Sequence, residues 1–109
     1  IKLDFVQAGE LPKEEKTAYI LICAIRECVT NAARYAEATK LYAEFTENET
    51  TASVKVTNNG IAPTEEISEG GGLSSLRSRV ERFGGEMLVQ SFPKFSLTVT
   101  VPKRKEGLS

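Results

Sequence analysis

The chain has 109 residues, which is enough for one small domain and too few for two. Hydrophobic residues make up 40% and charged residues 27%, which argues against a disordered chain, and the net charge of −1 argues against a protein that binds nucleic acids or membrane surfaces through a basic excess. With two cysteines and no histidine, the chain lacks the ligands of an ordinary zinc site and the base of a His-containing catalytic triad.

Residues 1–7 alternate weakly between apolar and polar side chains and predict a short strand. Pro12 suits a helix start, and the helical pattern that follows continues to Ala36. At about 100° per residue, the apolar side chains form one broad arc, which we expect to face the core. The arc consists of Ala18, Leu21, Ile22, Ile25, Cys28, Val29, Ala32, Ala33 and Ala36. The polar stripe expected on the opposite side consists of Glu27, Asn31 and Arg34.

Cys23 and Cys28 both fall on this helix, where five residues at about 1.5 Å rise leave them too far apart for a disulfide. We therefore expect two buried free thiols, which suit a reducing cytoplasm. No run is long enough to span a membrane and no signal peptide begins the chain, so the domain is expected to be cytoplasmic, in a parent protein that can be membrane-anchored. Because the chain begins at Ile1 rather than Met, we expect it to be excised from a longer protein.

Two alternating runs, 41–46 and 52–57, are joined by a polar connection and predict an antiparallel hairpin. The segment 58–72 then loses this pattern and is rich in Gly, Pro, Asn and acidic residues. A loop of this length in a small domain is usually functional or mobile.

A second helix is predicted over 73–83, where apolar residues recur at helical spacing and Gly84-Gly85 ends the pattern. Strands near 86–91 and 95–101 follow. Because the strands are apolar on one face only, the sequence predicts an α+β fold: a two-layer sandwich whose largely antiparallel, mixed sheet carries the helices on one face.

The domain is expected to span 1–103, with 104–109 as a disordered C-terminal tail. The basic cluster Lys103-Arg104-Lys105 is interpreted as part of this solvated terminus.

Two stretches carry residues suited to nucleotide chemistry, although no Gly-x-x-x-x-Gly-Lys-Ser/Thr or Gly-x-Gly-x-x-Gly phosphate loop is present. Glycines 70–72 precede the second helix, whose unpaired N–H groups and dipole favour phosphate. On the first helix, Asn31 offers a neutral oxygen for a hard cation, Glu27 a carboxylate and Arg34 a phosphate-pairing cation. Alone, each stretch is also typical of a loop with a helix cap or of a solvated helix face.

Together and in this order, these motifs resemble the ATP-binding domains of the histidine kinase, gyrase and heat-shock-chaperone superfamily, whose fold is of the Bergerat type. The helical pattern Glu-x-x-x-Asn-x-x-Arg-Tyr-Ala is similar to the N box, and Asn58-Asn59-Gly60 corresponds to the first glycine motif. Gly70-Gly71-Gly72-Leu73 matches the second glycine motif, and the residues between the two motifs correspond to the ATP lid. The chain is most similar to sensor histidine kinase domains with a short lid, and the resemblance covers nearly all of it.

The resemblance implies a Mg²⁺-dependent protein histidine kinase domain. Asn31 would bind Mg²⁺ at the ATP phosphates, Glu27 would belong to the catalytic surroundings of the metal and the nucleophile, and Arg34 would meet phosphate. The remaining residues implied in nucleotide binding are Tyr35, Asn58, Gly60, Gly70, Gly71, Gly72, Leu73 and Ser74. Since the chain has no histidine, the acceptor would lie on separate dimerisation helices, and a response regulator would receive the phosphate indirectly. Nucleic-acid binding and membrane contact by this domain are not expected.

Three positions depart from the family pattern. Asn58 replaces the adenine-reading Asp, which exchanges a charge-assisted hydrogen bond for a neutral one at a cost of about 1 kcal/mol. Ala62-Pro63 replaces a motif glycine and should stiffen the base of the lid, and Tyr35 replaces a common His.

These departures leave two alternatives to the kinase interpretation. One is a degenerate nucleotide-binding module that docks on a partner. The other is an anti-sigma-factor serine kinase, which shares this fold and size.

Overall fold

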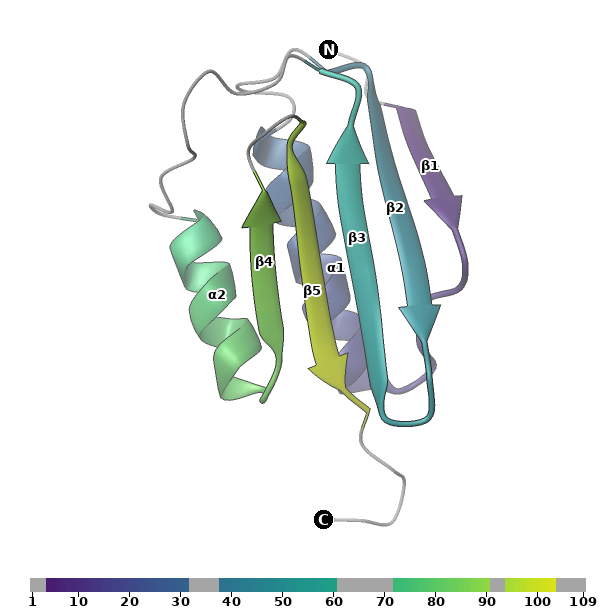
Figure 1. Cartoon of the computed structure of the whole chain (residues 1–109), viewed down its shortest axis with the longest axis vertical. Helices are drawn as coiled ribbons and strands as arrows, with labels where there is room; N and C mark the ends of the chain where they lie inside the picture. The colour runs from purple at the N-terminus through teal and green to yellow at the C-terminus, as the bar shows by residue number, and fades with distance from the viewer. Residues whose placement is uncertain (1–3, 32–37, 61–71, 91–93, 104–109) are drawn as a thin grey trace.

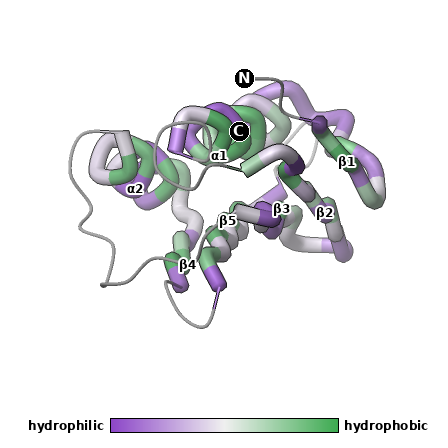
Figure 2. The backbone as a smooth tube through the Cα atoms, turned by 90° about the horizontal axis from the view of Figure 1, so that it is seen from above, coloured by the Kyte–Doolittle hydropathy of each residue, from purple (hydrophilic) through white to green (hydrophobic). Residues whose placement is uncertain are grey.

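The computed structural model describes residues 4–31, 38–60, 72–90 and 94–103. Its two helices, α1 (Glu15–Asn31) and α2 (Gly72–Arg82), lie on one face of a five-stranded sheet, as Figures 1 and 2 show. The predicted two-layer α+β sandwich is confirmed.

The sheet has the order β1-β2-β3-β5-β4. Its strands are β1 (Asp4–Ala8), β2 (Lys40–Glu47), β3 (Thr51–Asn58), β4 (Glu86–Gln90) and β5 (Ser96–Pro102). β1 runs parallel to β2 and every other neighbouring pair is antiparallel, so the sheet is mixed. The predicted hairpin is present, and Asn48 closes its turn by accepting hydrogen bonds at 2.8 Å from the backbone N–H groups of Thr50 and Thr51.

Strict alternation on the three central strands builds the sheet's half of the core. The side chains that face the helices are buried, whereas those between them point to the open face and are polar or half-buried. The buried set is Leu41, Ala43, Phe45, Ala52, Val54, Val56, Leu97, Val99 and Val101. Full burial of each large side chain contributes about 1.5–3 kcal/mol before the entropy of ordering it is counted.

Helix α1 begins later than predicted, and its buried face is only partly the predicted one: Ala18, Leu21 and Cys28 are buried as predicted. Its start is set by Glu14, whose Oε2 accepts a hydrogen bond at 2.5 Å from the Thr17 N–H and so caps the first turn. The predicted core residues Ile22 and Val29 are 39% and 38% exposed. The buried side chains are Thr17, Ala18, Ile20, Leu21, Cys23, Ala24 and Cys28, while the predicted Ala32, Ala33 and Ala36 lie outside the described residues. The prediction erred because α1 packs on the sheet below and on α2 beside it, which rotates the buried arc towards α2.

Helix α2 buries Leu73, Leu76 and Val80, which are among the apolar residues that recur at helical spacing. It ends at Gly84, whose φ of 87° is left-handed. The N–H of Gly85 donates to the Val80 carbonyl at 2.9 Å, and that of Gly84 donates to the Glu81 carbonyl at 3.0 Å. This hydrogen-bond pattern satisfies the last carbonyls of α2 and turns the chain into β4.

The structure corrects the interpretation of Lys103 as part of a solvated terminus. The Lys103 ammonium group forms a salt bridge of 2.8 Å with Glu47 and donates to the Asn48 carbonyl at 2.9 Å. Its backbone N–H donates to the Thr50 carbonyl at 2.8 Å. Lys103 therefore ties the end of β5 to the β2–β3 turn, whereas the predicted tail 104–109 lies outside the described residues.

Both cysteines are free and buried, as predicted from their spacing. Within the described part of the chain, no helix has the length and apolar character needed to cross a membrane.

Candidate functional site

The ends of three elements lie at the same end of the molecule. Helix α1 ends at Asn31, strand β3 ends at Asn58 and helix α2 begins at Gly72. Figure 1 shows these three ends at the same end of the sandwich. The fold therefore places the described parts of the three sequence motifs at one end of the molecule.

Glu27 lies directly against Gly72. A Cβ atom added to Gly72 would lie 2.7 Å from the Glu27 carboxyl carbon, so any larger residue would displace this carboxylate. Glu27 is half-buried rather than on the side of α1 opposite the core, because it lies on the flank that faces α2. A carboxylate in this position complements the unpaired N–H groups and the dipole at the start of α2.

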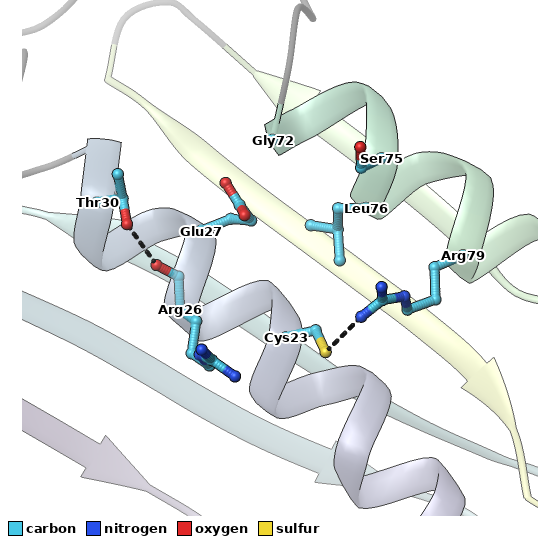
Figure 3. Close-up of a pocket in the computed structure, with 8 residues that line it drawn as sticks. All are labelled: Cys23, Arg26, Glu27, Thr30, Gly72, Ser75, Leu76 and Arg79. Atoms are coloured by element: carbon cyan, nitrogen blue, oxygen red, sulfur yellow. Dashed lines mark hydrogen bonds between the residues drawn. The ribbon is translucent and has the colours of Figure 1, made fainter.

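A cavity of about 250 Å³ separates the two helices beside this contact. Each helix contributes residues at positions i, i+3, i+4 and i+7, the spacing of one helix face. The residues that line it are Cys23, Arg26, Glu27 and Thr30 from α1 and Gly72, Ser75, Leu76 and Arg79 from α2. In Figure 3 the side chains of Glu27 and Arg79 extend from opposite helices into the space between them.

Arg79 connects the two helices at the far end of this cavity. Its Nη1 donates to the Cys23 sulfur at 3.2 Å and to the Tyr19 hydroxyl at 3.3 Å, and its guanidinium carbon lies 5.8 Å from the centre of the Tyr19 ring. The hydrogen bond to Cys23 is the main cause that raises the pKa of Arg79 above its ordinary value. Arg79 thus keeps its charge and holds α2 beside α1.

Cys28 is buried one residue after Glu27 and has a different environment. Burial, followed by the nearby Glu27 carboxylate, raises the pKa of the Cys28 thiol to about 12. Cys28 is therefore a neutral core side chain at physiological pH, whereas Cys23 lines the cavity.

Asn31 is half-buried one turn beyond Glu27 and is the last residue of α1. It does not line the cavity between the helices. At about 100° per residue, Asn31 lies on the same flank of α1 as Glu27, which corrects its predicted position opposite the core. The two polar residues of the sequence motif are therefore neighbours.

Asn58 and Asn59 have different partners at the end of β3. The Asn58 Oδ1 accepts a hydrogen bond at 2.8 Å from the N–H of Gly60. The Asn59 Oδ1 accepts from the N–H groups of Thr39 and Lys40, both at 2.9 Å, and its Nδ2 donates to the Thr39 hydroxyl at 2.9 Å. Asn59 therefore joins the end of β3 to the start of β2 and has a structural role.

The remaining predicted residues separate into two groups. The Leu73 side chain is buried in the core, so only its backbone could meet a ligand, and Ser74 is exposed. Arg34, Tyr35, Gly70 and Gly71 lie outside the described residues, as do Ala62 and Pro63.

The start of α2 offers unpaired backbone N–H groups to an anion. The Glu27 carboxylate lies against this helix end, where a negative group is complementary to the helix dipole. No cluster of three or more Cys, Asp or Glu side chains that could hold a metal occurs in the described ranges.

Sequence reasoning missed Cys23, Arg26, Thr30, Ser75, Leu76 and Arg79. The signal that could have found them is the repeated i, i+3, i+4, i+7 spacing that begins at Cys23 and again at Gly72. It was overlooked because a cysteine and a leucine on a helix are typical core residues.

A second hollow, of about 320 Å³, lies on the open face of the sheet over β1, β2 and β3. Its lining includes Val6, Tyr42 and Lys55, and none of the predicted site residues. The space between α1 and α2 is therefore the candidate site.

Comparison with known proteins identifies the fold. No protein-family model matches the chain. Among solved structures, it superposes on the histidine kinase domain of the blue-light activated histidine kinase EL346 from Erythrobacter litoralis with a TM-score of 0.71 and 21% identity, over 90% of this chain and 53% of that one. The ATP-binding domain of PrrB from Mycobacterium tuberculosis gives a TM-score of 0.68 at 17% identity, with 94% and 82% of the two chains covered.

The histidine kinase AdeS from Acinetobacter baumannii gives a TM-score of 0.65 at 17% identity, with 94% of this chain and 56% of that one covered. This chain therefore spans about half the length of the EL346 domain and of AdeS, and most of the PrrB domain. Likeness at these identities establishes a shared fold, that of histidine kinase ATP-binding domains.

Proposed function

We propose that this chain is the ATP-binding catalytic domain of a sensor histidine kinase and transfers the γ-phosphate of Mg-ATP to a histidine on separate dimerisation helices. The observation that carries the proposal is the contact of Glu27 with Gly72, which joins the acidic flank of α1 to the phosphate-favouring start of α2. This contact occurs on a fold that ATP-binding domains of histidine kinases share.

In the proposed site, the start of α2 and its preceding glycines bind the phosphates. Backbone N–H groups at Gly70, Gly71, Gly72 and Leu73 donate to the phosphate oxygens, with Ser74 beside them. Arg34 would contribute a fixed positive charge, and Asn31 would hold Mg²⁺, which would supply charge neutralisation for the transferred phosphoryl group.

The base lies at the opposite end of the nucleotide, where Asn58 and Gly60 form a turn at the end of β3. Tyr35, which the resemblance implies in nucleotide binding, lies outside the described residues. Glu27 is the acidic group beside the phosphates, and we assign it to holding the incoming imidazole by a hydrogen bond. Positioning and charge neutralisation supply most of the catalysis in phosphoryl transfer, so this small set of residues is sufficient.

Two further proposals follow from the absence of histidine in the sequence. The acceptor must come from dimerisation helices, and a response regulator then takes the phosphate from that histidine. Both ATP and these partners are cytoplasmic, which is also the location that two free cysteines suit.

The test is phosphotransfer in trans. The chain is mixed with γ-labelled Mg-ATP and a fragment that carries histidine-bearing dimerisation helices, and label on the fragment is followed with time. We expect acid-labile, base-stable phosphate on the fragment and none on this chain. Glu27→Gln should lower the rate by about 10²-fold or more, the usual scale for a positioned acid or base, whereas Glu81→Gln, which removes an exposed carboxylate from α2, should not change it.

Other outcomes would identify the alternatives. Acid-stable label on a serine of a partner protein would replace the proposal with a serine kinase. The absence of nucleotide binding in calorimetry at millimolar Mg-ATP would replace it with a docking module.

A further inference from the structure

We propose that strand β1 is a site of self-association, at which two copies of this chain pair their β1 strands antiparallel around a two-fold axis at Val6. The proposal concerns the sheet edge opposite β4 and does not depend on the proposed function. It is carried by the uncovered edge of β1, by the direction of its free backbone groups and by its exposed apolar side chains.

β1 is an edge strand whose outer side is covered by no other described element. It ends the sheet, pairs only with β2 and has all five of its residues exposed, and Figure 1 shows its place at the edge. At the opposite edge, α2 packs beside β4 and the Arg77 guanidinium donates to the Met87 carbonyl at 3.0 Å. Proteins commonly block an open edge with Lys, Pro or a bulge, because its unpaired N–H and C=O groups accept another strand. β1 contains neither Lys nor Pro, and its register with β2 is continuous.

One hydrogen bond at the start of β1 fixes the direction of its backbone groups. The Asp4 N–H donates to the carbonyl of Thr39, just before β2, at 2.8 Å, so Asp4 directs its backbone groups towards β2. Because these directions alternate along a strand, Val6 also points towards β2, whereas Phe5 and Gln7 present their N–H and C=O groups to the open edge. The two outward residues therefore flank Val6 symmetrically.

This symmetry suits a second copy of the same strand. In an antiparallel ladder, residue pairs that exchange both backbone hydrogen bonds alternate with pairs that exchange none. When Val6 lies opposite Val6 of the second copy, Phe5 of each copy exchanges both hydrogen bonds with Gln7 of the other. A two-fold axis at Val6 therefore satisfies the outward groups of both strands and joins the two sheets edge to edge.

The side chains of β1 favour the same pairing. Val6 is 45% exposed on the open face of the sheet, and Phe5 is 47% exposed on the face that carries the helices. In the pair, the two Val6 side chains meet directly, and the two Phe5 rings lie diagonally across the axis at roughly 7–8 Å. The charge on β1 belongs to Asp4, which lies beside Lys40 of its own β2 and opposite Ala8 of the second copy. The pairing thus covers apolar surface and sets no like charges opposite each other.

The first test measures the oligomeric state. One strand pair is small beside the roughly 800 Å² per partner of a standard interface, so we expect a reversible dimer with a dissociation constant between about 10 µM and 1 mM in sedimentation equilibrium. Val6→Lys sets two ammonium groups opposite each other and removes apolar contact, so it should weaken association about tenfold or more. A chain that stays monomeric up to about 1 mM would overturn the proposal.

Leu88→Lys is the matched control, because it adds the same charge to the open face at the other edge, where Leu88 is 67% exposed. Its dissociation constant should equal that of the wild type, and thermal melts verify that both lysine variants are folded. Equal weakening by Val6→Lys and Leu88→Lys would show that the dimer forms elsewhere and would overturn the proposal.

Cysteine cross-linking tests the register. The Cα atoms of the facing Val6 pair would lie about 4.5 Å apart, within the range of a disulfide, whereas two Gln7 residues would lie diagonally and beyond it. In a glutathione redox buffer, we expect Val6→Cys to form a disulfide-linked dimer about tenfold faster or more than Gln7→Cys. The wild type shows the background from Cys23 and Cys28, which are buried. Equal rates for the two variants would contradict the two-fold axis at Val6.

Discussion

Replacement of Gly72 should lower phosphotransfer activity while it leaves the stability of the fold nearly unchanged. The Gly72 backbone does not require glycine, but an added Cβ would collide with the Glu27 carboxylate. Because a Glu side chain is flexible, we expect Gly72→Ala to move the carboxylate and to change the free energy of unfolding by less than about 1 kcal/mol. Phosphotransfer should fall by about tenfold or more, since the displaced carboxylate no longer faces the incoming group. Denaturant unfolding and the transfer assay on the same protein measure the two effects.

The double variant Glu27→Ala/Gly72→Ala provides the control, because removal of the carboxylate removes the collision. We expect the Gly72→Ala change to cost activity in the wild-type background and almost none in the Glu27→Ala background. Additive losses would mean that Gly72 acts through its own backbone and not through Glu27.

The burial of Cys28 predicts how the stability of the domain depends on pH. The Cys28 thiol titrates near 9.0 in the unfolded chain and near 12 in the folded one. Above pH 9 the unfolded chain loses this proton while the folded chain keeps it, so the contribution of Cys28 to stability is complete below pH 9 and is lost as the pH rises towards 12. At pH 10 the loss is about 1.4 kcal/mol relative to neutral pH.

The measurement compares urea unfolding at pH 8 and pH 10 for the wild type, Cys28→Ala and Cys23→Ala. The decrease in the free energy of unfolding from pH 8 to pH 10 should be smaller by about 1.4 kcal/mol in Cys28→Ala than in the wild type. In Cys23→Ala this decrease should be as large as in the wild type. Equal drops in all three proteins would show that the Cys28 thiol is not protected by burial.

At the scale of elements, the end of α2 depends on one residue. Gly84 has a φ of 87°, and an added Cβ would meet only the Pro102 ring, at 3.6 Å, so space is available but the conformation is unfavourable. We therefore expect Gly84→Ala to destabilise the fold by about 1–2 kcal/mol, the cost of a left-handed conformation for a residue with a Cβ. Gly84→Asn should cost less, because Asn tolerates this conformation better. Thermal melts in which alanine and asparagine behave alike would argue against a conformational cause.

The elements themselves were largely predictable, and the reason is their regular pattern. The hairpin followed from alternation at Leu41, Ala43 and Phe45, and the end of α2 followed from Gly84-Gly85. The face of α1 did not follow, because Ile22 and Val29 are as apolar as Ile20 and Leu21. A periodicity argument finds the apolar arc of a helix, but it cannot know that a second helix lies on one flank and leaves the other exposed.

At the scale of the whole molecule, the sequence motifs predicted Glu27, Asn31, Asn58 and Gly72 as site residues, and the fold places the elements that carry them with their ends on one side of the molecule. The cavity between α1 and α2 was not predicted, because it depends on the relative rotation of two helices that are forty residues apart in sequence. Arg79 is an example of a site residue that sequence patterns alone do not predict. Only the packing of α2 beside α1 reveals that it reaches Cys23 and Tyr19.

The stability of the whole domain should therefore report on occupation of the site. A ligand that binds only the folded state at about 100 times its dissociation constant stabilises that state by about 2.7 kcal/mol, which for a domain of this size raises the melting temperature by about 10 °C or more. We expect this shift with ATP and Mg²⁺ together and a smaller one when EDTA removes the metal. Asn31→Ala should melt like the wild type without nucleotide but lose the difference between the two conditions, because it removes the side chain that we propose as the Mg²⁺ ligand. Asn31→Asp, which still offers an oxygen ligand, should restore it. If Asn31→Ala keeps a full Mg²⁺-dependent shift, the metal is held elsewhere and the role assigned to Asn31 is wrong.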